Sequence, residues 1–187
     1  MKGSPLRSPL YPRLAQGTRV VLVVAFVWEL VVFDPVGVLA IALFVALSFA
    51  YLLREERLPN LFDLLVALSA LLNAFGFVFD LYRAVPLYDE VAHAVTVFSL
   101  SLASFYLFYG EEIPPARALA TATAVFTLGV TAGSLWEVAE WTTGYAFSAN
   151  VVFGLGDAMT DLVANAAGAV VAALVALAIR RGGGRLS

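Results

Sequence analysis

Ionisable side chains recur at helical spacing inside apolar stretches of this 187-residue sequence. Asp89 and His93 are four residues apart, and Glu137 and Glu140 are three apart. Residues at these separations share one face of an α-helix. An ionisable group costs about 2.5–3.5 kcal/mol at the centre of a membrane-spanning helix, so such groups mark candidate functional sites.

A third segment repeats this pattern, since Asp157, Asp161 and Asn165 follow one another at intervals of four. Carboxylates packed closely cannot all stay ionised without a cation. One imidazole with several carboxylates suits a divalent metal ion such as Zn, Mn or Fe, and carboxylates alone suit Mg or Ca. We therefore expect a divalent metal ion, and its expected ligands are Asp89, His93, Glu137, Asp157 and Asp161.

A water molecule activated by such an ion needs a base, and Glu137 and Glu140 are the candidate catalytic residues. This chemistry predicts hydrolysis or group transfer on a lipid or lipid-linked substrate of the cell envelope. Two other classes stay open: a transporter coupled to protons or cations, and a non-catalytic envelope factor in which the metal only joins helices. Further polar residues are expected beside the site, namely Glu90, Asn165, Asn73 and Asp80.

The composition defines the kind of molecule that must position these groups. Hydrophobic residues make up 61% of the chain and charged residues 13%, whereas soluble domains have about 45–50% and about 25%. A soluble domain and a disordered chain are therefore excluded. The net charge of −3 argues against nucleic acid as a partner. With no cysteine and a single histidine, thiolate sites and two-histidine motifs are also excluded.

Six apolar stretches are separated by turns or charges, and each is long enough for a spanning helix of about 17–25 residues. The stretches are continuous rather than alternating, which favours helices over strands. We predict an all-α, polytopic membrane protein with one six-helix transmembrane domain over residues 1–187 and short tails at 1–13 and 180–187. The expected spans are Leu14–Phe33, Pro35–Leu53, Leu61–Tyr82, Asp89–Tyr109, Pro115–Thr142 and Asp157–Ile179.

The distribution of Lys and Arg predicts the orientation. In the six-span topology every Lys and Arg except Arg83 falls on the side of the two termini, which the positive-inside rule places in the cytoplasm. We expect a multi-pass protein of the inner membrane. Most acids fall on the opposite, outer side: Glu29, Asp34, Asp80, Asp89, Glu90, Glu137, Glu140, Asp157 and Asp161.

Three motifs, taken in order, resemble those of the YjdF-like inner-membrane family. They are Asp-x-x-x-His at 89–93, Glu-x-x-Glu-Trp at 137–141 and Gly-Asp-x-x-x-Asp at 156–161. Residues 161–169 are similar to the final helix of VanZ-like proteins. Those proteins usually carry Glu-x-x-Gln and a following Arg, where this chain has Glu137-x-x-Glu140 and no Arg. The resemblance covers roughly residues 73–175 and implies a polar site on membrane helices, without naming its reaction.

A further resemblance supplies an alternative enzyme class. Tyr88-Asp89 and Gly154-Leu155-Gly156-Asp157 match the Tyr-Asp and Gly-x-Gly-Asp motifs of presenilin-like and prepilin-type intramembrane aspartyl proteases. The match implies a dyad of Asp89 and Asp157 that shares one proton. Such a dyad leaves His93 and Glu137 without a role, so the metal site is the leading hypothesis.

Overall fold

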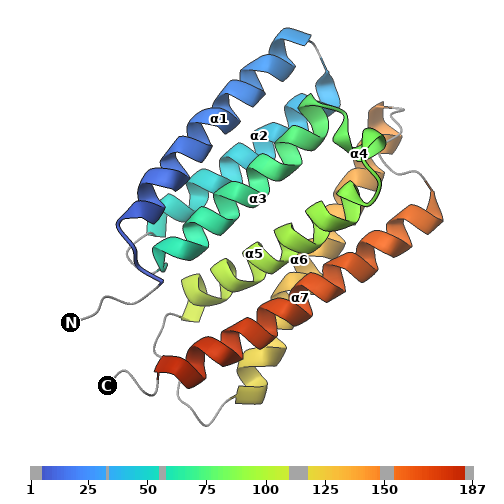
Figure 1. Ribbon diagram of the computed structural model, residues 1–187. Helices are drawn as coiled ribbons and strands as arrows, with labels where there is room; N and C mark the ends of the chain where they lie inside the picture. Colours follow the sequence, from blue (N-terminus) through green and yellow to red (C-terminus); the bar gives the residue numbers. More distant parts are fainter. Residues whose placement is uncertain (1–5, 33, 55–57, 110–117, 148–153, 184–187) are drawn as a thin grey trace. The chain divides into compact units, whose positions relative to one another are not determined.

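The chain is all-helical in the computed structural model, as the continuous apolar stretches predict (Figure 1). The structure describes residues 6–32, 34–54, 58–109, 118–147 and 154–183, and no strand occurs within these ranges. The chain divides into two compact units, Met1–Ala92 and His93–Ser187. The division falls inside a helix and leaves the prediction of a single domain untested.

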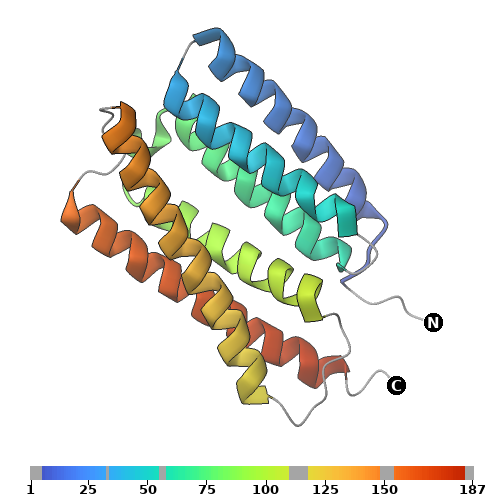
Figure 2. The ribbon, with the colours of Figure 1, turned by 180° about the vertical axis from the view of Figure 1, so that it is seen from behind.

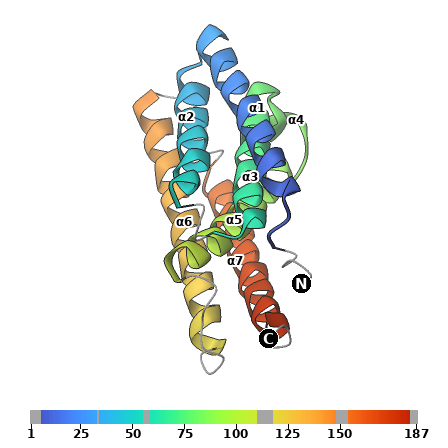
Figure 3. The same ribbon diagram turned by 90° about the vertical axis from the view of Figure 1, so that its left-hand side faces the viewer.

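The first unit is built on three long helices that pack against one another (Figures 1 and 3). Asp34 caps the second of them with its side chain and Pro35 follows at the first helical position, which is a common way to start a helix. The elements of this unit are α1 (Leu10–Val32), α2 (Pro35–Ala50), the 3-10 turn η1 (Tyr51–Arg54), α3 (Asn60–Val78) and the short α4 (Leu81–Ala84).

The second unit contains most of α5 (Tyr88–Tyr109), together with α6 (Ala118–Phe147) and α7 (Leu155–Gly183). Helices α6 and α7 cross and pack against each other, which Figure 2 shows from behind. The first turn of α5 belongs to the first unit, because the division lies between Ala92 and His93.

Five of the helices, α1, α3, α5, α6 and α7, are long and apolar enough to cross a membrane. Helix α2 is apolar but has only 16 residues. With η1 as its continuation it extends over about 32 Å, close to the roughly 30 Å of a bilayer's hydrocarbon core. The protein is therefore a polytopic membrane protein, and α2 with η1 corresponds to the expected span Pro35–Leu53.

The first and last helices of the chain extend beyond the bounds expected from the sequence. Helix α1 begins at Leu10 instead of Leu14, and α7 continues to Gly183 instead of ending at Ile179. Parts of the predicted tails 1–13 and 180–187 are thus helical. Hydropathy marks where a segment becomes apolar, whereas backbone hydrogen bonding continues into the polar flank.

The third span ends earlier than predicted, at Val78 instead of Tyr82. Asp80 adopts a left-handed backbone conformation with φ of 53°, which an α-helix cannot continue through. Tyr82 then lies in the separate helix α4, and its hydroxyl donates to Asn73 Oδ1 at 3.0 Å.

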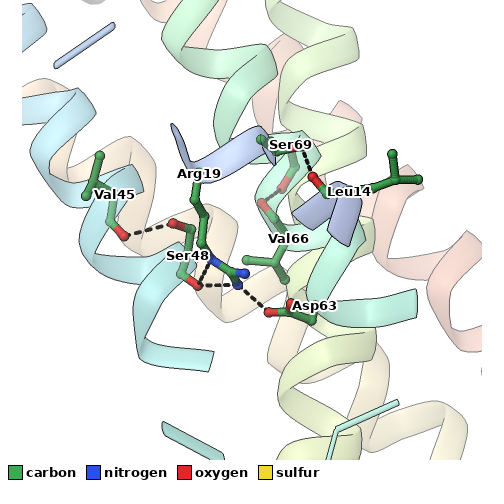
Figure 4. A network of polar contacts seen from close by, with 8 residues as sticks. Leu14, Arg19, Val45, Ser48, Asp63, Val66 and Ser69 are labelled. Atoms are coloured by element: carbon green, nitrogen blue, oxygen red, sulfur yellow. Dashed lines mark hydrogen bonds and ion pairs between the residues drawn. The ribbon is translucent and has the colours of Figure 1, made fainter. Parts of the chain in front are cut away.

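A buried ion pair joins the three helices of the first unit at one end (Figure 4). Arg19 of α1 is only 1% exposed, and its Nε and Nη2 donate to the carbonyl oxygen of Ser48 at 3.1 and 2.8 Å. Its Nη2 also pairs with Asp63 in the first turn of α3. A charge buried among apolar helices requires such partners, because water cannot solvate it there.

Candidate metal centre

His93 lies at the centre of a polar cluster within the second unit. Its side chain is 5% exposed, and its Nδ1 is 3.2 Å from Asn165 Oδ1 and 3.3 Å from Glu137 Oε1. On the other edge of the ring, Nε2 lies 4.0 Å from Asp161 Oδ1. The cluster therefore draws its residues from α5, α6 and α7.

The amide of Asn165 links the histidine to the α6 carboxylate. Its Nδ2 donates to Glu137 Oε1 at 3.3 Å, so the Oδ1 of the same amide is free to accept from His93 Nδ1. Metal-bound histidines commonly donate their second ring N–H to a carbonyl or carboxylate, which fixes the ring and its tautomer. In this tautomer the lone pair of Nε2 faces Asp161.

Glu140 completes a group whose ligand atoms converge. Single ligand atoms of His93, Glu137 and Glu140 all lie within 4.8 Å of one another, His93 being buried and both glutamates half-buried. The three-residue spacing of the glutamates places both on the face of α6 that meets His93. An imidazole with two carboxylates is a ligand set for a divalent transition metal.

Two glycines allow the helices to approach closely enough to form this cluster. A methyl group at Gly133 of α6 would lie 2.7 Å from Asn165 Cγ, and one at Gly168 of α7 would collide with the carbonyl oxygen of Ala94. Ala94 is the residue after His93, so the α7 backbone packs directly beside the histidine. Small residues serve this purpose in membrane helices generally.

Gly133 was not among the residues predicted to form the site, all of which carry ionisable or amide side chains. A usable signal was present, because Gly129 and Gly133 form a Gly-x-x-x-Gly repeat on α6. Both glycines are buried. The repeat ends one turn before Glu137 and therefore places a close helix contact, Gly133 against Asn165, next to the carboxylate.

The two aspartates of α7 differ in their surroundings. Asp161 is 2% exposed, and its Oδ1 faces His93 Nε2. Asp157 lies one turn earlier, in the first turn of α7, and is half-buried. It is not a member of the convergent group formed by His93 and the two glutamates, so its role as a ligand stays a prediction.

Asp89 and Glu90 lie in the first turn of α5 and belong to the first unit. Asp89 precedes His93 by one helical turn, and both acidic residues are half-buried. Their participation in the metal centre stays a prediction, as does the dyad of Asp89 and Asp157.

Two further polar residues expected beside the site, Asn73 and Asp80, also belong to the first unit and have local partners. Asn73 is 5% exposed; its Nδ2 donates to Ser69 O at 2.8 Å and its Oδ1 accepts from Tyr82. Asp80 is exposed and pairs with Arg83 at 3.4 Å, in the three-residue spacing of the sequence. These contacts give both residues a role in the connection between α3 and α5.

Comparison with known proteins identifies the family. Residues 14–182 match the model of a family of predicted membrane proteins, DUF2238, and the chain belongs to this family. An uncharacterized protein from Thermotoga maritima is 28% identical over 118 residues, which cover 59% of this chain and 59% of that protein. No solved structure matches the chain.

Proposed function

We propose that this member of the DUF2238 family binds a divalent metal ion through His93 and the carboxylates around it. The observation that supports the proposal most directly is the arrangement at His93, whose Nδ1 faces an amide and a carboxylate while Nε2 faces Asp161. The imidazole favours Zn, Mn or Fe over the harder ions Mg and Ca. Helices α5 and α6 contain no Lys or Arg, and the two arginines of α7, Arg180 and Arg181, lie in its last turn, at the end opposite Asp161. A bound ion would therefore also neutralise the carboxylates of the cluster.

The two glutamates of α6 have different roles in this proposal. Glu137 Oε1 accepts from Asn165 and lies 3.3 Å from His93 Nδ1, so Glu137 orients the ring. Glu140 is one turn further along α6 and half-buried, which suits a general base that exchanges protons with water. A divalent ion bound there would polarise a substrate oxygen and activate a water molecule.

The substrate class follows from the position of the centre in membrane helices. Under the positive-inside orientation, the start of α5, the end of α6 and the start of α7 face the outside of the inner membrane. We propose hydrolysis or group transfer on a membrane lipid or lipid-linked envelope substrate that enters laterally from the bilayer. The resemblance of the three motifs to those of the YjdF-like inner-membrane family supports a polar site of this kind on membrane helices.

Metal content tests the first part of the proposal. The wild-type protein, purified without chelator and dialysed against Zn, Mn or Fe, should retain about one equivalent of one of these ions. His93→Gln and Asp161→Asn should each lose it, whereas Asp80→Asn, which changes an exposed carboxylate paired with Arg83, should not. If the wild-type protein retains none of these three metal ions, the metal hypothesis is wrong.

Turnover tests the second part. Metal-loaded protein in vesicles of labelled envelope lipids should release a product, and Glu140→Gln, assayed at a metal concentration that fills the site, should lose about 10²–10⁴-fold in rate. Equal rates for the wild type and Glu140→Gln would overturn the assignment of the base.

A further inference from the structure

The first unit contains a second carboxylate group that has no part in the His93 centre. Glu29 lies on the buried face of α1 and is 3% exposed. Arg19 on the same face shows what a charge in this position requires, since it binds both a carbonyl oxygen and a carboxylate. Glu29 has no hydrogen bond or ion pair with any described residue, so its charge lacks a comparable partner.

The carboxylate of Asp34 approaches the same point from the start of α2. A methyl group at Gly37 would lie 2.7 Å from Glu29 Oε2 and 2.9 Å from Asp34 Oδ2. The two oxygens are therefore neighbours, and the missing side chain of Gly37 leaves the space between them. Asp34 uses its other oxygen, Oδ1, to cap α2 by accepting from Val36 N at 3.1 Å.

The charged residues of the surrounding helices do not balance this pair. Helix α2 contains no charged residue, and the only one in α3 is Asp63, which pairs with Arg19. Arg83 pairs with Asp80 on an exposed surface. The amino end of α2 contributes about half a positive charge, which leaves most of the negative charge of two carboxylates uncompensated.

We propose that Glu29 and Asp34 bind a hard divalent cation, Ca²⁺ or Mg²⁺, at the junction of α1 and α2. Two carboxylates without histidine or cysteine form a ligand set for these ions, which complete their coordination with water. Asp34 is exposed and opens the site to water, whereas Glu29 anchors the ion to the buried face of α1. The bound ion joins the two helices at the end opposite the Arg19–Asp63 pair.

Calcium binding to the purified full-length protein tests this proposal. After treatment with chelator, the wild type should bind about one radiolabelled Ca²⁺ per chain at the two carboxylates, and the thermal midpoint should rise with Ca²⁺. Glu29→Gln keeps the shape of the side chain but removes a ligand. It should weaken Ca²⁺ binding by at least the 10–100-fold that is typical when a residue hydrogen-bonded to a metal ligand is replaced. Gly37→Ala should weaken it as well, because its methyl group occupies the space between the carboxylates.

Two control variants separate this site from its surroundings and from the His93 centre. Asp80→Asn removes an exposed carboxylate of the same unit and should leave Ca²⁺ binding unchanged. His93→Gln should lose the transition metal and keep Ca²⁺, so each proposal can fail alone. Equal Ca²⁺ affinity in the wild type and Glu29→Gln would overturn the inference. A second outcome would also overturn it. The wild type would bind no Ca²⁺ and would show the infrared band of a protonated carboxyl group, and Glu29→Gln would remove that band. The pair would then hold a proton instead of a metal ion.

Discussion

The neighbours of His93 orient both nitrogens of its ring. Asn165 and Glu137 face Nδ1, and Asp161 faces Nε2. Such an environment restricts the ring to one orientation before any ion binds. Preorganised ligands raise metal affinity because little conformational freedom is lost on binding.

Asn165→Ala tests the orienting role of the amide. We expect metal affinity to fall by about 10–100-fold, less than the complete loss expected for Asp161→Asn, because Asn165 acts through the imidazole. Competition with a chromophoric chelator measures both affinities. Asn73→Ala is the matched control, since Asn73 is also buried but hydrogen-bonded within the first unit. Unchanged affinity in Asn165→Ala would contradict the orienting role.

At the scale of elements, helix packing depends on a few small or charged residues. The close approach of α5 and α7 exists because Gly168 has no side chain beside Ala94. The three helices of the first unit meet at Arg19, whose guanidinium reaches α2 and α3. Packing without voids and paired buried charges replace the hydrophobic effect, which does not drive helices together within a lipid phase.

Gly168→Ala should disturb the metal centre without changing any ligand. The added methyl group meets backbone, so α7 must move away from α5, at a cost of about 1–3 kcal/mol. We expect a lower thermal midpoint and weaker metal binding in the same variant. Gly17→Ala is the control, because a methyl group there meets nothing within 4 Å. Metal affinity equal to that of the wild type would show that the close contact is not needed for the site.

Removal of one partner of the Arg19–Asp63 pair should destabilise the first unit strongly. Asp63→Leu leaves a buried guanidinium without its carboxylate, for which we expect a loss of about 3–5 kcal/mol. The double variant Arg19→Met with Asp63→Leu should recover most of this loss, because no uncompensated charge remains. Unfolding in denaturing detergent measures both values. The exposed pair of Asp80 and Arg83 is the control, and Asp80→Asn should cost less than about 1 kcal/mol.

At the scale of the whole molecule, the number of crossings depends on α2. Five helices satisfy the length and hydropathy of a span, and α2 reaches a comparable length only together with η1. With α2 as a span, both termini lie on one side of the membrane. Without it, Arg7 and Asp80 would lie on the same side, since α1 and α3 would be the only crossings between them.

Labelling of single cysteines distinguishes these topologies, and the chain has no native cysteine to interfere. Asp80→Cys should react with an impermeant thiol reagent added outside intact cells, whereas Arg7→Cys and Arg181→Cys should react only after lysis. Both arginines and Asp80 are exposed, so burial does not limit the reaction. Labelling of Arg7→Cys and Asp80→Cys on the same side would show that α2 does not cross. A reversed pattern would place the centre in the cytoplasm and favour the prepilin-type alternative.

The sequence by itself determined the fold class, because no soluble structure can bury a chain with 61% hydrophobic residues. It also predicted that Glu137 shares a helix face with Glu140, and Asp161 with Asn165, since helical periodicity is a local property. The bounds of α3 were not predictable from hydropathy, because a left-handed residue at Asp80 ends the helix within an apolar stretch.

Only the tertiary structure decided which partners these residues have. The sequence does not show that Asn165 bridges His93 and Glu137, because the three residues are separated by long stretches of chain and come from different helices. In the same way, Glu29 and Asp34 meet at Gly37 only once α1 and α2 have packed. Spacing along one helix determines which residues share a face of that helix. Contact between the faces of two helices depends on how closely their backbones approach, and here glycines without side chains set that distance.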